Sequence, residues 1–197
     1  MMSASRQVDW TVDSFLAREA RQECRWEFGG LQPVGMPGGA FEHDAIQVNR
    51  VAALHGRLAR RACRVHGDSR KIRVVGSIGY PDAFVTCTPI ARGATPVAEP
   101  VVIFEGMSPI TVRTARTDRT VKNREYAGAA DVRRYIMLEQ TAQEGTMFTR
   151  SVEGDDWVGH ILPPDNVIRL AEIGIELPLA EIYAGLDFSG DVAGEDS

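Results

Sequence analysis

The chain has 197 residues, of which 44% are hydrophobic and 25% charged, and its formal net charge is −5 at pH 7. This composition is that of an ordinary globular protein, and the length fits one domain. There is no apolar run of about 18 residues and no basic segment followed by an apolar core at the N-terminus, so we expect neither a membrane span nor a secretory signal.

The three cysteines, Cys24, Cys63 and Cys87, are odd in number and widely spaced. This spacing favours neither a disulfide framework nor a zinc site. We therefore expect a protein of the reducing cytoplasm.

The charged residues are unevenly distributed along the chain. Residues 50–124 contain 14 of the 22 lysines and arginines but only five of the 27 acidic residues. A basic zone around a few acids is typical of a phosphate-binding metal site, although the negative net charge argues mildly against nucleic acid as a partner. Mutual neutralisation of acidic and basic parts in the folded protein would explain the same distribution.

The pattern of apolar and turn residues in the first half of the chain predicts alternating helices and strands. Residues 1–8 carry no pattern, and we expect them to be disordered. A short helix is predicted over 9–20, a strand or bent hairpin over 25–34 and a long amphipathic helix over 41–63. A strand or hairpin follows over 64–75, and a Gly-Tyr-Pro-Asp turn then leads into an apolar core strand that ends at Thr86.

The second half begins with a proline-containing surface loop over 88–100, which leads into an apolar strand from Val101. A helix is predicted over 114–128 and another buried strand over 133–139. Short strands follow at 146–150, 157–162, 167–170 and 173–177, then a short helix at 179–183 and an acidic tail, 187–197, that we expect to be disordered. The pattern predicts a single α/β domain over 9–186 with a mixed central sheet.

One buried strand ends in a carboxylate. Glu105 directly follows the apolar run at residues 101–104, where an isolated charge is costly to desolvate. A second carboxylate, Asp82, precedes the other core strand, and Lys122 lies on the helix predicted after Glu105. Two neighbouring carboxylates repel unless a cation lies between them, and Mg²⁺ or Mn²⁺ prefers such ligands together with water and phosphate oxygens.

These three side chains together suit the hydrolysis of a phosphodiester. A bound metal ion lowers the pKa of a water molecule, and a nearby lysine can position that water and stabilise developing negative charge. Each residue also has an ordinary explanation, because a Pro-Asp pair is commonly a turn, an acid commonly ends a strand and a helix lysine commonly faces solvent. The three residues alone do not decide between these explanations.

The order of these residues resembles the PD-(D/E)XK nuclease superfamily, and the wider pattern is similar to its Uma-two family, long catalogued as a domain of unknown function. The similar segments lie within residues 10–186 and include Trp26-Glu27, Glu42-His43, Tyr80-Pro81-Asp82, 102–105, 108–111, Asp118 with Lys122 and Tyr126, 134–139 and 174–183. The resemblance implies a restriction-endonuclease-like α/β fold, a mixed central sheet flanked by helices with additional antiparallel hairpins.

The resemblance also implies roles for individual residues. Asp82 and Glu105 would bind Mg²⁺ or Mn²⁺, and Lys122 would replace the superfamily's lysine, whose usual place is taken here by Met107. The supporting candidates are Glu27, His43, Asp118 and Tyr126. The candidates for binding DNA are Arg50, Arg57, Arg113, Arg116 and Arg119.

The sequence departs from the family pattern at three places. Gly30-Leu31 stand where an Asp-Gly pair is usual, Gly106 where an aliphatic residue is usual and Glu139 where an aspartate is usual. Two functions are therefore open: a metal-dependent DNA endonuclease acting as a homodimer, since paired sites suit the cutting of two strands, or a module with the same fold and weakened catalysis that binds nucleic acid or a protein.

Overall fold

The computed structural model describes residues 10–35, 40–74, 76–97, 99–107, 122–150 and 157–188. It begins with helix α1 (Val12–Glu19), strands β1 (Trp26–Phe28) and β2 (Pro33–Gly35), and the long helix α2 (Phe41–Leu58). Strands β3 (Arg64–Gly67), β4 (Ile72–Val74), β5 (Ser77–Gly79) and β6 (Ala83–Thr86) follow. The C-terminal half contains β7 (Val102–Met107), a helical segment over 122–127, β8 (Arg134–Glu139), β9 (Gly145–Arg150), β10 (Trp157–Leu162), β11 (Val167–Leu170), β12 (Ile175–Pro178) and α4 (Leu179–Ile182).

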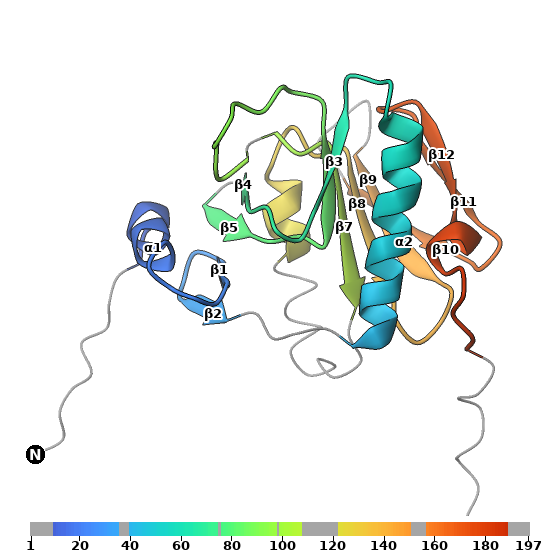
Figure 1. The fold of residues 1–197 in the computed structure, drawn as a ribbon, viewed down its shortest axis with the longest axis horizontal. Coiled ribbons are helices and arrows are strands. Elements are labelled where there is room, and N and C mark those ends of the chain that lie inside the picture. Colours follow the sequence, from blue (N-terminus) through green and yellow to red (C-terminus); the bar gives the residue numbers. More distant parts are fainter. Residues whose placement is uncertain are drawn as a thin grey trace, which may run out of the picture.

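A six-stranded sheet forms the centre of the described chain, with the strand order β10-β9-β8-β7-β6-β3. Strands β7 and β8 are parallel, whereas the other neighbouring pairs are antiparallel, so the sheet is mixed, as predicted. A four-stranded sheet, β2-β1-β5-β4, and the β11–β12 hairpin complete the described strands. Figure 1 shows α2 running alongside the central sheet, with α1 and the β1–β2 hairpin at one side of the molecule.

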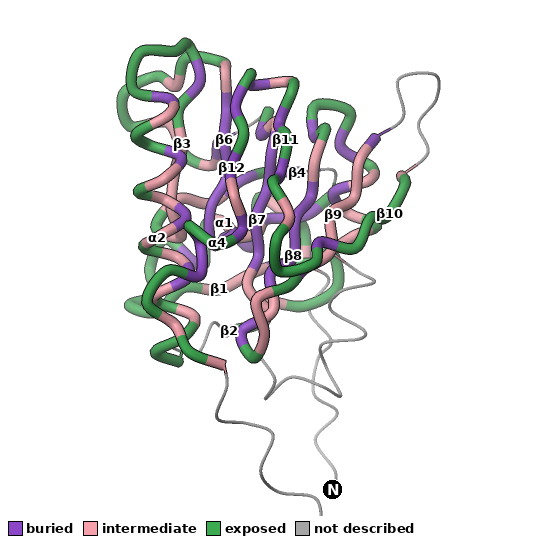
Figure 2. The backbone as a smooth tube through the Cα atoms, turned by 90° about the vertical axis from the view of Figure 1, so that its right-hand side faces the viewer, coloured by how far each residue is buried: buried purple, intermediate pink, exposed green. Residues whose placement is uncertain are grey.

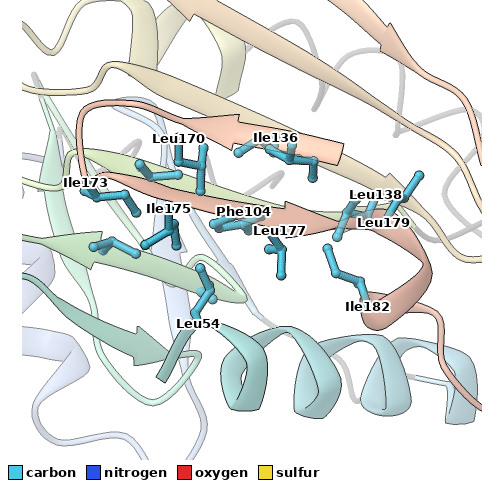
Figure 3. Packing of buried hydrophobic residues seen from close by; sticks show 14 of the residues in the cluster. Leu54, Phe104, Ile136, Leu138, Leu170, Ile173, Ile175, Leu177, Leu179 and Ile182 are labelled. Carbon is cyan, nitrogen blue, oxygen red and sulfur yellow. The ribbon is translucent and has the colours of Figure 1, made fainter. Parts of the chain in front are cut away.

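Apolar side chains cover both faces of the central sheet. On one face, α2, the β11–β12 hairpin and α4 enclose a cluster that includes Leu54, Phe104 and Leu138 (Figure 3). On the other face, Ile103 packs in a second cluster with Tyr126 of the segment 122–127. Neighbouring residues of β7 thus enter different clusters, and Figure 2 shows the buried residues concentrated along the central strands. This double burial explains the continuous apolar run in the sequence.

The start of α1 is specified by a capping box. The hydroxyl of Thr11 accepts a hydrogen bond from the backbone N–H of Ser14 at 3.1 Å, and the hydroxyl of Ser14 accepts one from the N–H of Thr11 at 2.9 Å. Two backbone donors that lack helical partners are satisfied in this way. The helix then buries Phe15, which stacks on Phe28 of β1 with ring centroids 5.3 Å apart.

The predicted end of the long helix at Cys63 is wrong, because α2 ends at Leu58. Residues 59–63 instead turn the chain, so that Arg64 at the start of β3 pairs with Thr86 of β6. Strands β3 and β4 also do not form a hairpin, since β4 pairs with β5 in the other sheet. Pairing with distant strands therefore sets these boundaries, and local periodicity does not contain that information.

Cys63 and Cys87 form a disulfide, contrary to the expectation from their spacing. They extend the β3–β6 register by one position beyond the pair of Arg64 and Thr86. Antiparallel pairing therefore brings together two cysteines that are 24 residues apart in sequence. Cys24 is free and exposed.

The terminal segments are described only in part. Residues 1–8, predicted to be disordered, lie outside the described residues, as do 189–197 of the predicted acidic tail. Phe188, near the start of that tail, packs its ring 5.8 Å from the ring of Tyr183. No helix within the described parts of the chain has the length and apolar character needed to cross a lipid bilayer.

Candidate active site

The two predicted carboxylates are neighbours across two strands. Asp82 immediately precedes β6 and Glu105 lies in β7, and the antiparallel register pairs Ala83 with Phe104. This register places Asp82 beside Glu105 at one end of the strand pair. Both residues are almost completely buried, with relative exposures of 8% for Asp82 and 6% for Glu105.

Both carboxylate oxygens of Asp82 have hydrogen-bonding partners. The backbone N–H of Gly106 donates to Oδ2 at 2.5 Å, and Nε2 of His43 lies 3.3 Å from Oδ1. Burial acts to raise the pKa of Asp82, but the hydrogen bond from His43 and the charge of Arg50 outweigh it and lower the pKa. Asp82 is therefore ionised at neutral pH, and its hydrogen bond in turn raises the pKa of His43.

Glu105 extends toward the helical segment 122–127. Its Oε1 accepts a hydrogen bond from the hydroxyl of Tyr126 at 3.0 Å and lies 3.2 Å from Nζ of Lys122. Burial raises the pKa of Glu105 to about 7, even though the charge of Lys122 opposes the shift. The ionisation of this carboxyl at neutral pH therefore depends on nearby cations.

Lys122 lies between two carboxylates that come from different sheets. Its Nζ is 3.2 Å from Oε1 of Glu105 and 3.4 Å from Oε2 of Glu27 on β1. Glu27 also accepts a hydrogen bond at 3.0 Å from the backbone N–H of Tyr80, which lies two residues before Asp82. The N-terminal hairpin therefore contributes a third acidic side chain next to Lys122.

Gly106 is required by the close packing around Asp82. A Cβ atom at this position would lie 2.9 Å from Nδ1 of His43 and 3.1 Å from Oδ2 of Asp82. These distances are too short for an added methyl group, so a side chain here would displace His43 from Asp82. The departure from the family pattern at Gly106 thus has a local reason, the close approach of two polar side chains to a buried strand.

Two of the arginines expected to bind DNA are not placed to do so at the acids: one of them is buried, and the other lies far from the acids. Arg50 is fully buried, with Cζ 5.6 Å from the centroid of the Phe104 ring, and its side-chain nitrogens have no hydrogen-bond partner within the described structure. The expectation is wrong for Arg50, because a DNA phosphate cannot reach a guanidinium without exposed surface. Arg57 binds Glu181 at 2.6 Å and lies about 20 Å along α2 from His43.

The remaining predicted site residues fall into two groups. Glu27, His43 and Tyr126 each contact Asp82, Glu105 or Lys122. The others lie outside the described residues, namely Arg113, Arg116, Asp118, Arg119 and the segment 108–111.

Gln140 is a polar neighbour of the site that is not among the predicted site residues. Its Nε2 lies 2.9 Å from Nδ1 of His43, on the other side of the ring from Asp82, and its exposure is 5%. The parallel register of β7 and β8 pairs Met107 with Glu139, so the residue after β8 lies close to the end of β7. A polar residue directly after a buried strand was the available signal.

Asp82 and Glu105 supply the oxygen atoms that could bind a divalent cation. Among the described residues, no group of three or more His, Cys, Asp or Glu side chains is placed to hold a metal ion. Mg²⁺ commonly binds one or two carboxylates and completes its coordination with water and substrate phosphate oxygens. The donor set of this carboxylate pair therefore fits such an ion.

The mixed sheet, with two acids on adjoining strands and a lysine from the connection between β7 and β8, defines a restriction-endonuclease-like α/β fold. A family model named Uma2, with the description "Putative restriction endonuclease", matches residues 12–180. The chain therefore belongs to the Uma2 family.

The fold is also found among solved structures. The crystal structure of "a putative nuclease belonging to DUF820" from Anabaena variabilis matches with a TM-score of 0.67 and 16% sequence identity, over 88% of this chain and 97% of that one. At this level of identity the similarity concerns the fold. A search of the curated proteins finds no match.

Proposed function

We propose that this protein is a divalent-metal-dependent endonuclease that hydrolyses phosphodiester bonds in DNA. The observation that carries the proposal is the 3.2 Å contact between Lys122 and Glu105, next to the second buried acid, Asp82. Two carboxylates and a lysine suit phosphodiester hydrolysis, and membership of the Uma2 family supports a nucleic acid as the substrate.

Asp82 and Glu105 would hold the metal ion, Mg²⁺ or Mn²⁺. A bound ion supplies Lewis acidity and a water molecule of lowered pKa. The Glu105 carboxyl, with its pKa raised to about 7, is only partly ionised at neutral pH, and a divalent cation beside it would favour the charged form. This property of Glu105 supports a cation at the carboxylate pair.

Lys122 would act on the phosphate or on the attacking water. Its ammonium nitrogen lies 3.2 Å from Glu105 and 3.4 Å from Glu27, and an ammonium group that reaches a substrate oxygen would donate a hydrogen bond to it. A donor in this place stabilises the negative charge that develops on the phosphate. Tyr126 would orient the Glu105 carboxylate, since its hydroxyl donates to Oε1 at 3.0 Å.

Plasmid cleavage tests this proposal. Wild-type protein is incubated with supercoiled DNA and Mn²⁺ beside Asp82→Asn, Glu105→Gln and Lys122→Met, with Asp68→Asn as the control because Asp68 pairs with Arg25 at the surface. We expect the wild type and Asp68→Asn to cut equally, and the three site variants to lose about 100-fold or more in rate. Equal cleavage by Asp82→Asn and the wild type would contradict the proposed site.

The same experiment separates cleavage from simple binding. A module without catalysis would bind DNA with an affinity that falls steeply with salt and would leave the plasmid intact. Calorimetry with Mn²⁺ gives an independent measure, because a metal-binding heat that disappears in Asp82→Asn argues for the metal site.

We also propose that the protein acts as a symmetric homodimer. Cutting both strands of a duplex requires two sites, and two-fold dimers are the commonest oligomers. Sedimentation of the full chain measures its mass in solution. A monomer that makes double-strand breaks in a single encounter would count against the dimer.

A further inference from the structure

The ring of His43 is held between two buried polar side chains. Nε2 lies 3.3 Å from Oδ1 of Asp82, and Nδ1 lies 2.9 Å from the amide nitrogen of Gln140. Asp82 and Gln140 are 8% and 5% exposed. The ring therefore connects the residue before β6 with the residue after β8.

The contact of Nε2 with Oδ1 of Asp82 indicates which ring nitrogen carries a proton. A carboxylate can only accept hydrogen bonds, so Nε2 of His43 must carry the hydrogen that it shares with Oδ1. In the neutral ring, Nδ1 then has a lone pair and accepts a hydrogen bond from the amide of Gln140. The two contacts are thus mutually consistent.

The backbone that presents Gln140 is itself fixed. The hydroxyl oxygen of Tyr183 lies 2.7 Å from the carbonyl oxygen of Glu139 and 2.8 Å from that of Glu144. The N–H of Glu139 also donates to the carbonyl of Glu144 at 3.0 Å. These contacts close the turn after β8, so Gln140 extends from a well-anchored position.

Gly106 leaves the space that the ring occupies. The nearest atom to a Cβ built at Gly106 is Nδ1 of His43, the atom that Gln140 contacts. The N–H of Gly106 meanwhile donates to Oδ2 of Asp82. One glycine therefore makes room for His43 and holds the second oxygen of the same carboxylate.

We propose that Gln140 is a positioning residue that holds His43 so that its Nε2–H stays on Oδ1 of Asp82. With Oδ2 bonded to Gly106, the carboxylate is fixed in one orientation and keeps a lone pair on each oxygen for a divalent cation. In this arrangement His43 is a hydrogen-bond donor to a metal ligand and is not itself a ligand. The part of the inference that concerns a metal ion rests on the proposed function, whereas the orientation of His43 does not.

Substitution of Gln140 by methionine removes both hydrogen-bonding groups at similar length. The matched control is Gln143→Met in the same turn, because the amide of Gln143 donates to the carbonyl of Pro164 at an exposed position. Gly106→Ala is a second variant, which crowds Nδ1 of His43, the ring nitrogen that Gln140 contacts, and should give the same result if Gln140→Met folds poorly.

Nuclear magnetic resonance of the metal-free protein provides the first measurement. In alkaline solution, the wild type and Gln143→Met should show a protected ring N–H on Nε2 of His43, identified by its absence in His43→Asn. The signal should vanish through fast solvent exchange in Gln140→Met. An unchanged signal in Gln140→Met, or a protected proton on Nδ1 in the wild type, overturns the inference.

Calorimetric titration with Mn²⁺ provides the second measurement. The affinity should fall about tenfold in Gln140→Met, the usual effect of losing a residue that orients a metal ligand, and should be unchanged in Gln143→Met. Loss of the ring N–H signal with undiminished Mn²⁺ affinity overturns the positioning role. If the wild type binds no Mn²⁺, the proposed function fails, and the resonance measurement alone decides whether Gln140 holds His43.

Discussion

Glu105 is a buried acid whose charge depends on its surroundings. Burial raises its pKa from the ordinary value of 4.5 to about 7. Between these two pH values, the folded protein holds a proton that the unfolded chain has released. The contribution of Glu105 to stability is therefore complete below pH 4.5 and is lost as the pH rises through about 7.

This linkage predicts that the difference in the free energy of unfolding between the wild type and Glu105→Gln depends on pH, because the amide of the variant does not titrate. As the pH rises from 4.5 to about 7, the metal-free wild type should lose on the order of 3 kcal/mol relative to the variant and then level off. Urea unfolding across this range measures the difference. Glu176→Gln, at an exposed position on β12, should show no such trend, and a constant difference for Glu105→Gln would contradict the raised pKa.

At the scale of elements, the segment that carries Lys122 and Tyr126 is held by Arg150 of β9. The guanidinium donates to the carbonyl oxygens of Ala127 at 2.8 Å, Ala129 at 2.9 Å and Val132 at 3.1 Å. Ala127 is the last residue of the helical segment, and Ala129 and Val132 follow it. The positive charge therefore lies at the C-terminal end of the helix, where it also interacts favourably with the helix dipole. Arg150 of β9 thus helps to fix the position of the helical segment that carries Lys122.

Arg150→Met should therefore destabilise the protein and loosen this segment. Three backbone carbonyls, two of them in buried contacts, would lose a charged donor, which we expect to cost about 3 kcal/mol in the free energy of unfolding. The control is Arg169→Met, which breaks an exposed ion pair with Glu176 and should cost less than about 1 kcal/mol. Hydrogen exchange should be faster over residues 122–132 in Arg150→Met alone, and equal effects of the two substitutions would argue against the anchoring role.

At the scale of the whole molecule, the N-terminal unit is tied to the site by a buried polar contact. Glu19 of α1 is 7% exposed, forms an ion pair with Lys71 and accepts a hydrogen bond from the hydroxyl of Tyr80 at 2.5 Å. The backbone N–H of Tyr80 in turn donates to Glu27. Helix α1 therefore supports the residue that holds the third acid beside Lys122.

Glu19→Gln tests whether this contact stabilises the whole domain. The change leaves Lys71, whose side chain is only 13% exposed, without its counter-charge, which should lower the free energy of unfolding by about 3 kcal/mol. Glu23→Gln is the matched control, since Glu23 lies in the same part of the chain and is exposed. Chemical denaturation gives both values, and a similar result for the two variants would show that Glu19 is not an anchor.

Much of the fold could be predicted from the sequence, because most elements follow from local pattern. The apolar runs identify β7 and β8, and Glu105 stands out against the run that precedes it. Arg50 could not be placed correctly in this way. It lies on the buried side of α2 between Ile46 and Leu54, yet a periodicity argument assigns every arginine to the solvent side.

Other features depend on which strands pair, and the sequence alone does not specify that. The disulfide between Cys63 and Cys87 needs the β3–β6 register. Gln140 and His43 are 97 residues apart, and their contact needs β8 to lie parallel to β7. Such long-range pairings bring residues together without leaving a local signal.

The parallel pairing of β7 and β8 has a consequence for how related proteins are found. Because the two strands run in the same direction, the chain must return from one end of the sheet to the other between Met107 and Arg134. Lys122 lies on this return and still reaches Glu105. Any position along the return that approaches the end of β7 could carry the same ammonium group. Searches with motifs of fixed residue spacing will therefore overlook such chains, whereas a search by spatial arrangement of the acids and the lysine will detect them.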